Sequence, residues 1–184
     1  IDGAEVEIRI DSKNLLKSLR FTNKDIYSDV NANGLLKESE DFIEWELPSN
    51  EVAILKYKVR LTREKGKERF DALVNEEWAI FRGDNLIPAV RTVEVGNAAA
   101  NAKIEFILPE QWKSVETGWP LESKKNNVYV FRVDNPERLF DRPIGWIIAG
   151  KKLGIRYANI KSTNVVVAAP RDQGMRRMDA LVFF

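Results

Sequence analysis

The segment from residue 29 to residue 40 carries the pattern of oxygen ligands that a calcium-binding loop needs. Positions 1, 3, 5 and 12 of such a loop hold oxygen-bearing side chains, which here are Asp29, Asn31, Asn33 and Glu40. Gly34 stands at position 6, where the loop turns sharply. The residues that follow alternate like a strand rather than a helix. The pattern leaves two hypotheses open, a calcium loop or an Asn-Gly turn that joins two strands.

Two further segments carry side chains that could contact a substrate. The chain has five tryptophans, and Trp45 and Trp78 fall on the apolar positions of strand patterns, which predicts a place in the core. Trp112 and Trp119 lie in predicted loops, so we expect them to be exposed. Arg82 and Asp84 lie in a predicted turn after a short strand. The candidates for a substrate cleft are Arg82, Asp84, Trp112 and Trp119.

Histidine and cysteine, two residue types that many enzymes use for catalysis, are missing. The chain has no histidine and no cysteine, which excludes a serine–histidine–aspartate triad, a His-Glu-x-x-His zinc site and any thiolate chemistry within these residues. Glu76 and Glu77 are neighbours on a strand pattern and would point to opposite faces. We therefore name no catalytic residue and no cofactor-binding residue in this chain.

The composition is that of a globular protein with balanced charge. Hydrophobic residues make up 44% and charged residues 31% of the 184 positions, which is enough for a hydrophobic core. The 29 basic and 28 acidic residues leave a net charge of +1, so no overall field attracts nucleic acid. No apolar run reaches the roughly 18 residues of a membrane-spanning helix. We expect neither a nucleic-acid partner nor insertion into a membrane.

Alternating apolar and polar residues predict a series of short strands. The longest alternation runs from Leu55 to Leu61, with Lys56, Lys58 and Arg60 between the apolar positions. Similar patterns, closed by Gly, Pro or Asn turns, occupy residues 6–10, 43–47, 78–80, 104–108 and 128–133. Such a series favours an antiparallel β-sandwich. A helical turn is expected near Lys13 to Leu19.

The pattern changes towards the C-terminus. Val165 to Ala169 is a continuous apolar run, typical of a strand that is buried on both faces. Met175 to Phe184 has apolar residues at helical spacing and lacks a stop signal. We expect a sandwich domain over residues 1–160 and the truncated start of an α/β domain over residues 161–184. The apolar final helix is expected to mediate a homodimer or to fold back on the sandwich.

Three segments together resemble the N-terminal half of a known enzyme family. The first runs from Tyr57 to Asp84 and includes Trp78-Ala79-Ile80-Phe81-Arg82-Gly83-Asp84; the second is Leu108-Pro109-Glu110-Gln111-Trp112, and the third is Leu139-Phe140-Asp141-Arg142-Pro143-Ile144-Gly145. The chain resembles the glycyl aminopeptidase-like zinc metallopeptidases, which often carry a PDZ domain. Gln111 replaces the family's usual glycine, and Gly145-Trp146 replaces an acidic residue, so the resemblance is to a divergent branch.

The resemblance implies a fold and a function. The family's N-terminal domain is a β-sandwich, and the next domain has a thermolysin-like fold, whose first strand and helix would be residues 164–184. The His-Glu-x-x-His helix that binds zinc would lie beyond Phe184. The chain would then be a non-catalytic domain that packs on its own missing catalytic domain and shapes the cleft of a zinc-dependent aminopeptidase. We expect a bacterial hydrolase that is periplasmic or otherwise exported rather than cytoplasmic.

Two other functions stay open from the residues alone. One is an independent β-sandwich recognition module that binds glycan or protein through exposed tryptophans. The other is a structural domain that calcium stabilises through Asp29, Asn31, Asn33 and Glu40.

Overall fold

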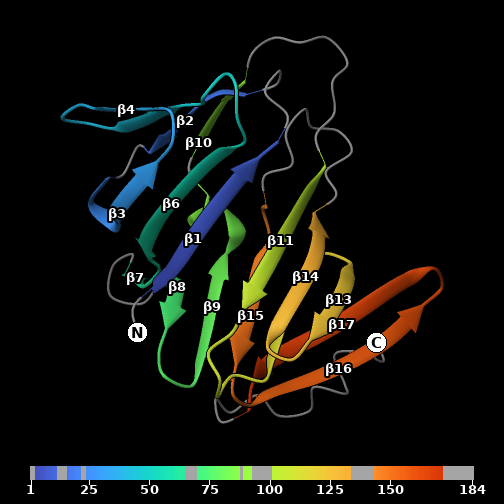
Figure 1. The fold of residues 1–184 in the computed structure, drawn as a ribbon. Helices are drawn as coiled ribbons and strands as arrows, with labels where there is room; N and C mark the ends of the chain where they lie inside the picture. The colour runs from blue at the N-terminus through green and yellow to red at the C-terminus, as the bar shows by residue number, and fades with distance from the viewer. Residues whose placement is uncertain are drawn as a thin grey trace.

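The protein is built almost entirely from antiparallel β-strands (Figure 1). The structure is a computed structural model that describes residues 3–11, 16–21, 24–64, 70–87, 89–92, 101–133 and 143–171. Within these residues the only helical elements are two short 3-10 turns, η1 (Lys24–Ile26) and η2 (Gly83–Asn85). The predicted antiparallel, mainly β fold is therefore confirmed.

The first pair of sheets is formed by the N-terminal strands. One sheet has the order β1-β6-β3 and the other has the order β10-β2-β5-β4. Their strands are β1 (Gly3–Ile10), β2 (Leu16–Phe21), β3 (Tyr27–Ala32), β4 (Leu35–Glu38), β5 (Ile43–Glu46), β6 (Ala53–Arg60) and β10 (Ala89–Thr92). The rings of Phe21 on β2 and Tyr57 on β6 meet edge to face at 5.2 Å, so the two sheets pack across a shared core.

Strand β6 shows why the alternating residues form these sheets. Leu55, Tyr57 and Val59 are buried, while the intervening lysines are exposed. On the exposed face Lys56 Nζ lies 2.9 Å from Glu7 Oε2 on β1. The predicted alternation is confirmed, because one face of the sheet meets the core and the other meets solvent.

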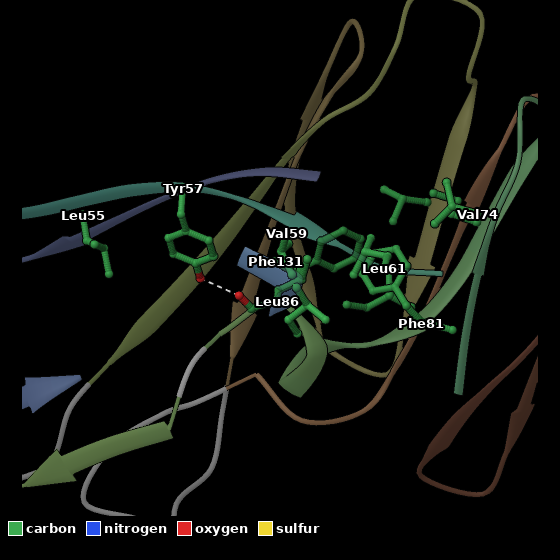
Figure 2. Packing of buried hydrophobic residues seen from close by; sticks show 14 of the residues in the cluster. Leu55, Tyr57, Val59, Leu61, Val74, Phe81, Leu86 and Phe131 are labelled. Carbon is green, nitrogen blue, oxygen red and sulfur yellow. Dashed lines mark hydrogen bonds between the residues drawn. The ribbon is translucent and has the colours of Figure 1, made fainter. Parts of the chain in front are cut away.

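The second pair of sheets follows in the chain. One sheet has the order β11-β14-β13 and the other has the order β12-β15-β9-β8-β7. Their strands are β7 (Arg63–Glu64), β8 (Phe70–Val74), β9 (Trp78–Arg82), β11 (Ala102–Ile107), β12 (Ser114–Thr117), β13 (Leu121–Lys125), β14 (Val128–Val133) and β15 (Trp146–Gly150). Phe131 on β14 and Phe81 on β9 belong to the same buried cluster as Leu55 and Tyr57 (Figure 2). One continuous core therefore joins all four sheets.

A two-stranded ribbon of β16 (Leu153–Ile160) and β17 (Thr163–Pro170) follows the second pair of sheets (Figure 1). The strand expected at residues 165–169 is confirmed, but its burial on both faces is wrong, since Val166 is 39% exposed. The reason is that β17 pairs with β16 alone among the described strands. The predicted domain boundary at residues 160 and 161 falls at the turn of this ribbon.

Two expected helices have different outcomes. The helical turn expected at residues 13–19 is wrong where the chain is described, because residues from Leu16 onward form β2. Leu19 and Phe21 face the core and alternate with Ser18 and Arg20, a strand period that outweighs the helical spacing of the leucines. The helix expected at residues 175–184 lies outside the described residues, so the α/β start and the dimer contact stay predictions.

Candidate functional site

The turn η2 is held in place by its own side chains and by the core. Asn85 is buried, and its Oδ1 accepts a hydrogen bond of 3.0 Å from the backbone N–H of Arg82. The N–H of Leu86 donates to the carbonyl of Gly83 at 3.0 Å. The hydroxyl of Tyr57 donates to the carbonyl of Leu86 (Figure 2). A turn with this many internal bonds can present side chains in a fixed geometry.

Trp119 packs against this turn because Gly83 leaves room for its ring. The N–H of Gly83 donates to the carbonyl of Gly145 at 2.9 Å. A Cβ on Gly83 would lie 3.0 Å from Cη2 of Trp119 and 2.7 Å from the carbonyl oxygen of Pro143. Gly145 also has a positive φ of 140°, which favours glycine. The sequence thus places small residues where the indole and two loops meet.

Arg82 and Trp146 lie beside this turn and face away from the core. They are directly opposite each other where β9 pairs with β15, so their side chains share one face of the sheet. Trp146 is 54% exposed, and Nε of Arg82 donates to Oδ1 of Asp84 at 3.0 Å. We call this group the tryptophan–arginine site, which consists of Arg82, Asp84 and Trp146. Trp119 is not part of it, because Trp119 packs against the core beside Gly83 and Gly145, on the face of the sheet opposite to Arg82 and Trp146.

The side chains of the site are of types that stack on a ligand or form hydrogen bonds with it. An exposed indole face can stack on a sugar ring, a peptide group or a cation. The guanidinium of Arg82 and the carboxylate of Asp84 can hydrogen-bond polar groups of opposite charge. Among the described residues there is no group of three or more His, Cys, Asp or Glu side chains that could hold a metal ion. The side chains of the site are therefore suited to the recognition of a ligand.

The structure brings together two of the four residues that the sequence named for a substrate cleft. Arg82 and Asp84 form an ion pair at η2. Trp119 packs on the core side of Gly83, and Trp112 does not join them either. Its Nε1–H donates to the carbonyl of Glu76 at 3.2 Å, in the turn before β9, whereas Arg82 ends that strand. The expected exposure of Trp112 is wrong, because its ring is only 5% exposed.

Trp146 is the residue of the site that sequence reasoning missed. The apolar run that it begins predicts burial, and four of its five residues are indeed buried. Trp146 is the exception and is the first residue of β15, whereas Ile148 on the same face of the strand is buried. The positive φ at Gly145 next to it is the local signal of a sharp change in chain direction. Trp45 is fully buried as predicted, whereas Trp78 is half-buried.

The calcium-ligand candidates take part in other contacts. They span β3 and β4, which belong to different sheets, so the Asn-Gly segment crosses between sheets. Oδ2 of Asp29 lies 2.8 Å from Nζ of Lys58, and the hydrogen bond raises the pKa of that lysine. Oδ1 of Asn33 accepts from the N–H of Ile54 at 2.7 Å. Asn31 lies opposite Lys56, and Glu40 lies in the bend after β4.

Calcium binding by this segment stays a prediction. Parts of β3 and β4 lie within the segment, and strand β5 follows it, where an EF-hand has a helix after its loop. A rise in melting temperature with millimolar calcium that Asp29→Asn abolishes would support the prediction. The absence of any shift would reject it.

Tyr157 makes one of the contacts between the β16–β17 ribbon and the second pair of sheets. The hydroxyl of Tyr157 donates to Oε1 of Glu116 on β12 at 2.8 Å. Partial burial of the hydroxyl, and then the carboxylate that it bonds, raise the pKa of Tyr157 to about 12. The contact fixes where the ribbon leaves the sheet.

Comparison with known proteins gives a similarity of fold. No protein-family model matches the chain, and no curated protein matches it. Among solved structures, the chain is similar to the crystal structure of the aminopeptidase N family protein from Idiomarina loihiensis, with a TM-score of 0.62 and 18% sequence identity. The similarity covers 89% of this chain and 29% of that chain. The chain thus has the fold of a part of an aminopeptidase-like protein and spans less than a third of that protein's length.

Among the described residues, no helix has the length and apolar character needed to cross a membrane.

Proposed function

We propose that the chain is a non-catalytic domain, N-terminal to the catalytic domain, of a larger zinc-dependent aminopeptidase. In this proposal it packs on the catalytic domain, and the tryptophan–arginine site forms one wall of the substrate cleft. The observation that supports the proposal is the fold similarity to an aminopeptidase N family protein, which covers most of this chain but only 29% of the other. We further propose that the chain is related to the glycyl aminopeptidase-like branch. The proposal also includes a bacterial source and an exported, periplasmic location.

The residues of this chain do not fit a zinc site. The sequence contains neither histidine nor cysteine, and the described residues contain no cluster of acidic side chains that could replace them. A zinc ion and its activated water would therefore be held by polypeptide outside this chain. The role left to the described residues is to bind and orient substrate through Trp146, Arg82 and Asp84.

The experiment compares the 184-residue chain with the longer natural polypeptide. We expect the longer polypeptide to hydrolyse glycine and alanine anilides in a zinc-dependent manner, and the 184-residue chain to show no turnover with added zinc. Zinc-dependent turnover by the 184-residue chain, or a natural reading frame that encodes no zinc-binding helix after residue 184, would overturn the proposal.

A variant of the longer polypeptide tests the role of the site. Trp146→Ala should raise KM about tenfold or less and leave kcat nearly unchanged, because it removes binding that substrate and transition state share. Ile107→Ala is the matched control, since Ile107 is 73% exposed on β11 and is not part of the site. Equal effects of the two substitutions would remove the tryptophan–arginine site from the cleft.

The exposed indole of Trp146 also favours a second candidate function. A tryptophan that is half exposed beside an arginine–aspartate pair can serve as a stacking platform in a glycan- or protein-recognition module. Titration of the 184-residue chain with soluble oligosaccharides or peptides, followed by tryptophan fluorescence, tests this. Saturable binding that Trp146→Ala abolishes would favour the recognition module, and no binding to either ligand class would reject it.

A further inference from the structure

Among the edge strands of the described sheets, β17 is the exception because it carries no charged residue. Charged side chains on an edge strand discourage pairing with further strands. Every edge strand that the structure describes carries at least one charged residue except β17: the charged ones are β1, β3, β4, β7, β10, β11, β12, β13 and β16. Strand β17 reads Thr-Asn-Val-Val-Val-Ala-Ala-Pro. It therefore lacks charged protection against a partner strand, and its one proline lies at its end.

The register of the ribbon shows which backbone groups of β17 point outward. The N–H of Arg171 donates to the carbonyl of Lys152 across the ribbon, and bonded and non-bonded pairs alternate along an antiparallel ladder. The odd-numbered residues of β17 therefore bond to β16, and the even-numbered ones face the free edge. Pro170 has no N–H, so the outward donors are the amides of Asn164, Val166 and Ala168.

The opposite edge of the ribbon, formed by β16, already takes part in hydrogen bonds. By the same register, the carbonyl of Ile155 points outward from β16. Nη1 of Arg156 donates to that carbonyl at 3.0 Å. Tyr157 on the same strand is bonded to Glu116. A further strand would have to displace these contacts on β16, whereas no described strand pairs with the free edge of β17.

The side chains of the ribbon would gain burial from a third strand. Tyr157 and Val166 are opposite each other on one face and are 67% and 39% exposed. Ile160, on the other face, is 46% exposed. A two-stranded ribbon is marginally stable by itself in water, and a third strand with an apolar face stabilises it.

We propose that the free edge of β17 pairs with an extended, uncharged strand from the polypeptide that follows residue 184 in the longer protein. This inference rests on the part of the proposed function that makes the chain a fraction of a longer protein. We choose this partner strand because the matched part is 29% of the similar solved chain, which leaves 71% of that chain outside the match (100% minus 29%). Strand β17 is the last element described, and strands that follow one another in sequence commonly pair.

Residue-resolved hydrogen–deuterium exchange of the 184-residue chain and of the longer natural polypeptide tests the inference. We expect the amides of Asn164, Val166 and Ala168 to exchange at least about tenfold more slowly in the longer polypeptide, because each becomes a donor in a ladder. The inward amides of Val165 and Val167 are the internal reference and should be protected in both.

A matched pair of substitutions makes the test specific. Val166→Pro removes an outward amide that β16 does not use, so it should abolish the added protection of Asn164 and Ala168 in the longer polypeptide. Asn159→Pro removes an outward amide from the edge of β16 and should leave that protection intact. If either variant fails to fold, the wild-type exchange comparison still decides the question.

The outcomes separate this inference from the proposed function. A zinc-dependent longer polypeptide whose three outward amides stay unprotected overturns the inference and leaves the proposed function standing. Protection in a longer polypeptide without peptidase activity supports the inference and overturns the function. A stable dimer of the longer polypeptide that depends on the same amides overturns the inference in favour of a second copy of the chain.

Discussion

At the scale of single residues, Asn33 joins two sheets through hydrogen bonds. Its side-chain N–H donates to the carbonyl of Val52 at 2.9 Å, and its Oδ1 accepts from the N–H of Ile54 at 2.7 Å. Its backbone carbonyl accepts a bond of 2.6 Å from Nε1 of the buried Trp45. The residue thus connects the chain that crosses between sheets to β5 and β6.

Removal of the Asn33 side chain should destabilise the fold. Asn33→Ala is expected to lower the free energy of unfolding by about 1–3 kcal/mol, because the N–H of Ile54 loses its partner. Asn31→Ala, at an exposed position of β3, should change it by less than about 0.5 kcal/mol. Urea denaturation of both variants measures the difference, and equal values would contradict the assigned role.

The hydroxyl of Tyr157 should lose its proton at an unusually high pH. Its pKa is raised from 10.0 to about 12, so the folded state keeps a proton that the unfolded state releases first. The stabilisation is fully present below about pH 10 and is lost as the pH rises through about 12. Ultraviolet absorbance of tyrosinate, compared with Tyr157→Phe, measures this pKa. Glu116→Gln should lower it only part of the way to 10.0, since burial is the larger cause; no change at all would contradict the contact.

At the scale of elements, the two glycines under Trp119 allow η2 to meet the chain before β15. Gly83 and Gly145 are joined by a backbone hydrogen bond of 2.9 Å, and a Cβ on Gly83 would lie 2.7 Å from the carbonyl oxygen of Pro143, which leaves no room for a side chain there. The site therefore depends on close backbone approach as much as on the residues that face solvent.

Substitutions of glycine by alanine test this close approach. Gly83→Ala should destabilise the fold by about 1–3 kcal/mol, because the new Cβ would lie 2.7 Å from the carbonyl oxygen of Pro143. Gly118→Ala is the matched control, since its Cβ would meet nothing within 4 Å, and should change stability by less than about 0.5 kcal/mol. Thermal denaturation monitors both variants; an unaffected Gly83→Ala would show that the loops can separate.

At the scale of the whole molecule, the four main sheets share one hydrophobic core. Leu19 and Trp45 of the first pair of sheets belong to the same buried cluster as Val115 and Ile147 of the second pair. Sheets that share a core lose their packing together, which favours a single cooperative unfolding transition.

Unfolding of the 184-residue chain should therefore follow one transition. Tryptophan fluorescence, which reports on Trp45 and Trp112 in different pairs of sheets, should change at the same urea concentration as far-UV circular dichroism. Two separated transitions would show that the two pairs of sheets fold independently.

The sequence predicted the elements whose signals are local. The alternation in β1, β6 and β14 and the turn residues between strands are sufficient for an antiparallel β fold, because the period of a strand depends only on neighbouring residues. The turn signal at residues 82–85 likewise led to Arg82 and Asp84. Strand β2 was missed because the leucines at its start also fit a helical spacing.

The tertiary structure alone decided which strands pair and which surfaces stay open. Asn-Gly after β3 reads as a turn between neighbours, yet β3 and β4 belong to different sheets. The burial of Trp112 and the exposure of Trp146 depend on loops that are distant in sequence. Residue types by themselves determined that this chain holds no histidine or cysteine chemistry and that its strands have one apolar face. The assembly of the tryptophan–arginine site and the open edge of β17 required contacts between distant residues, which no local pattern encodes.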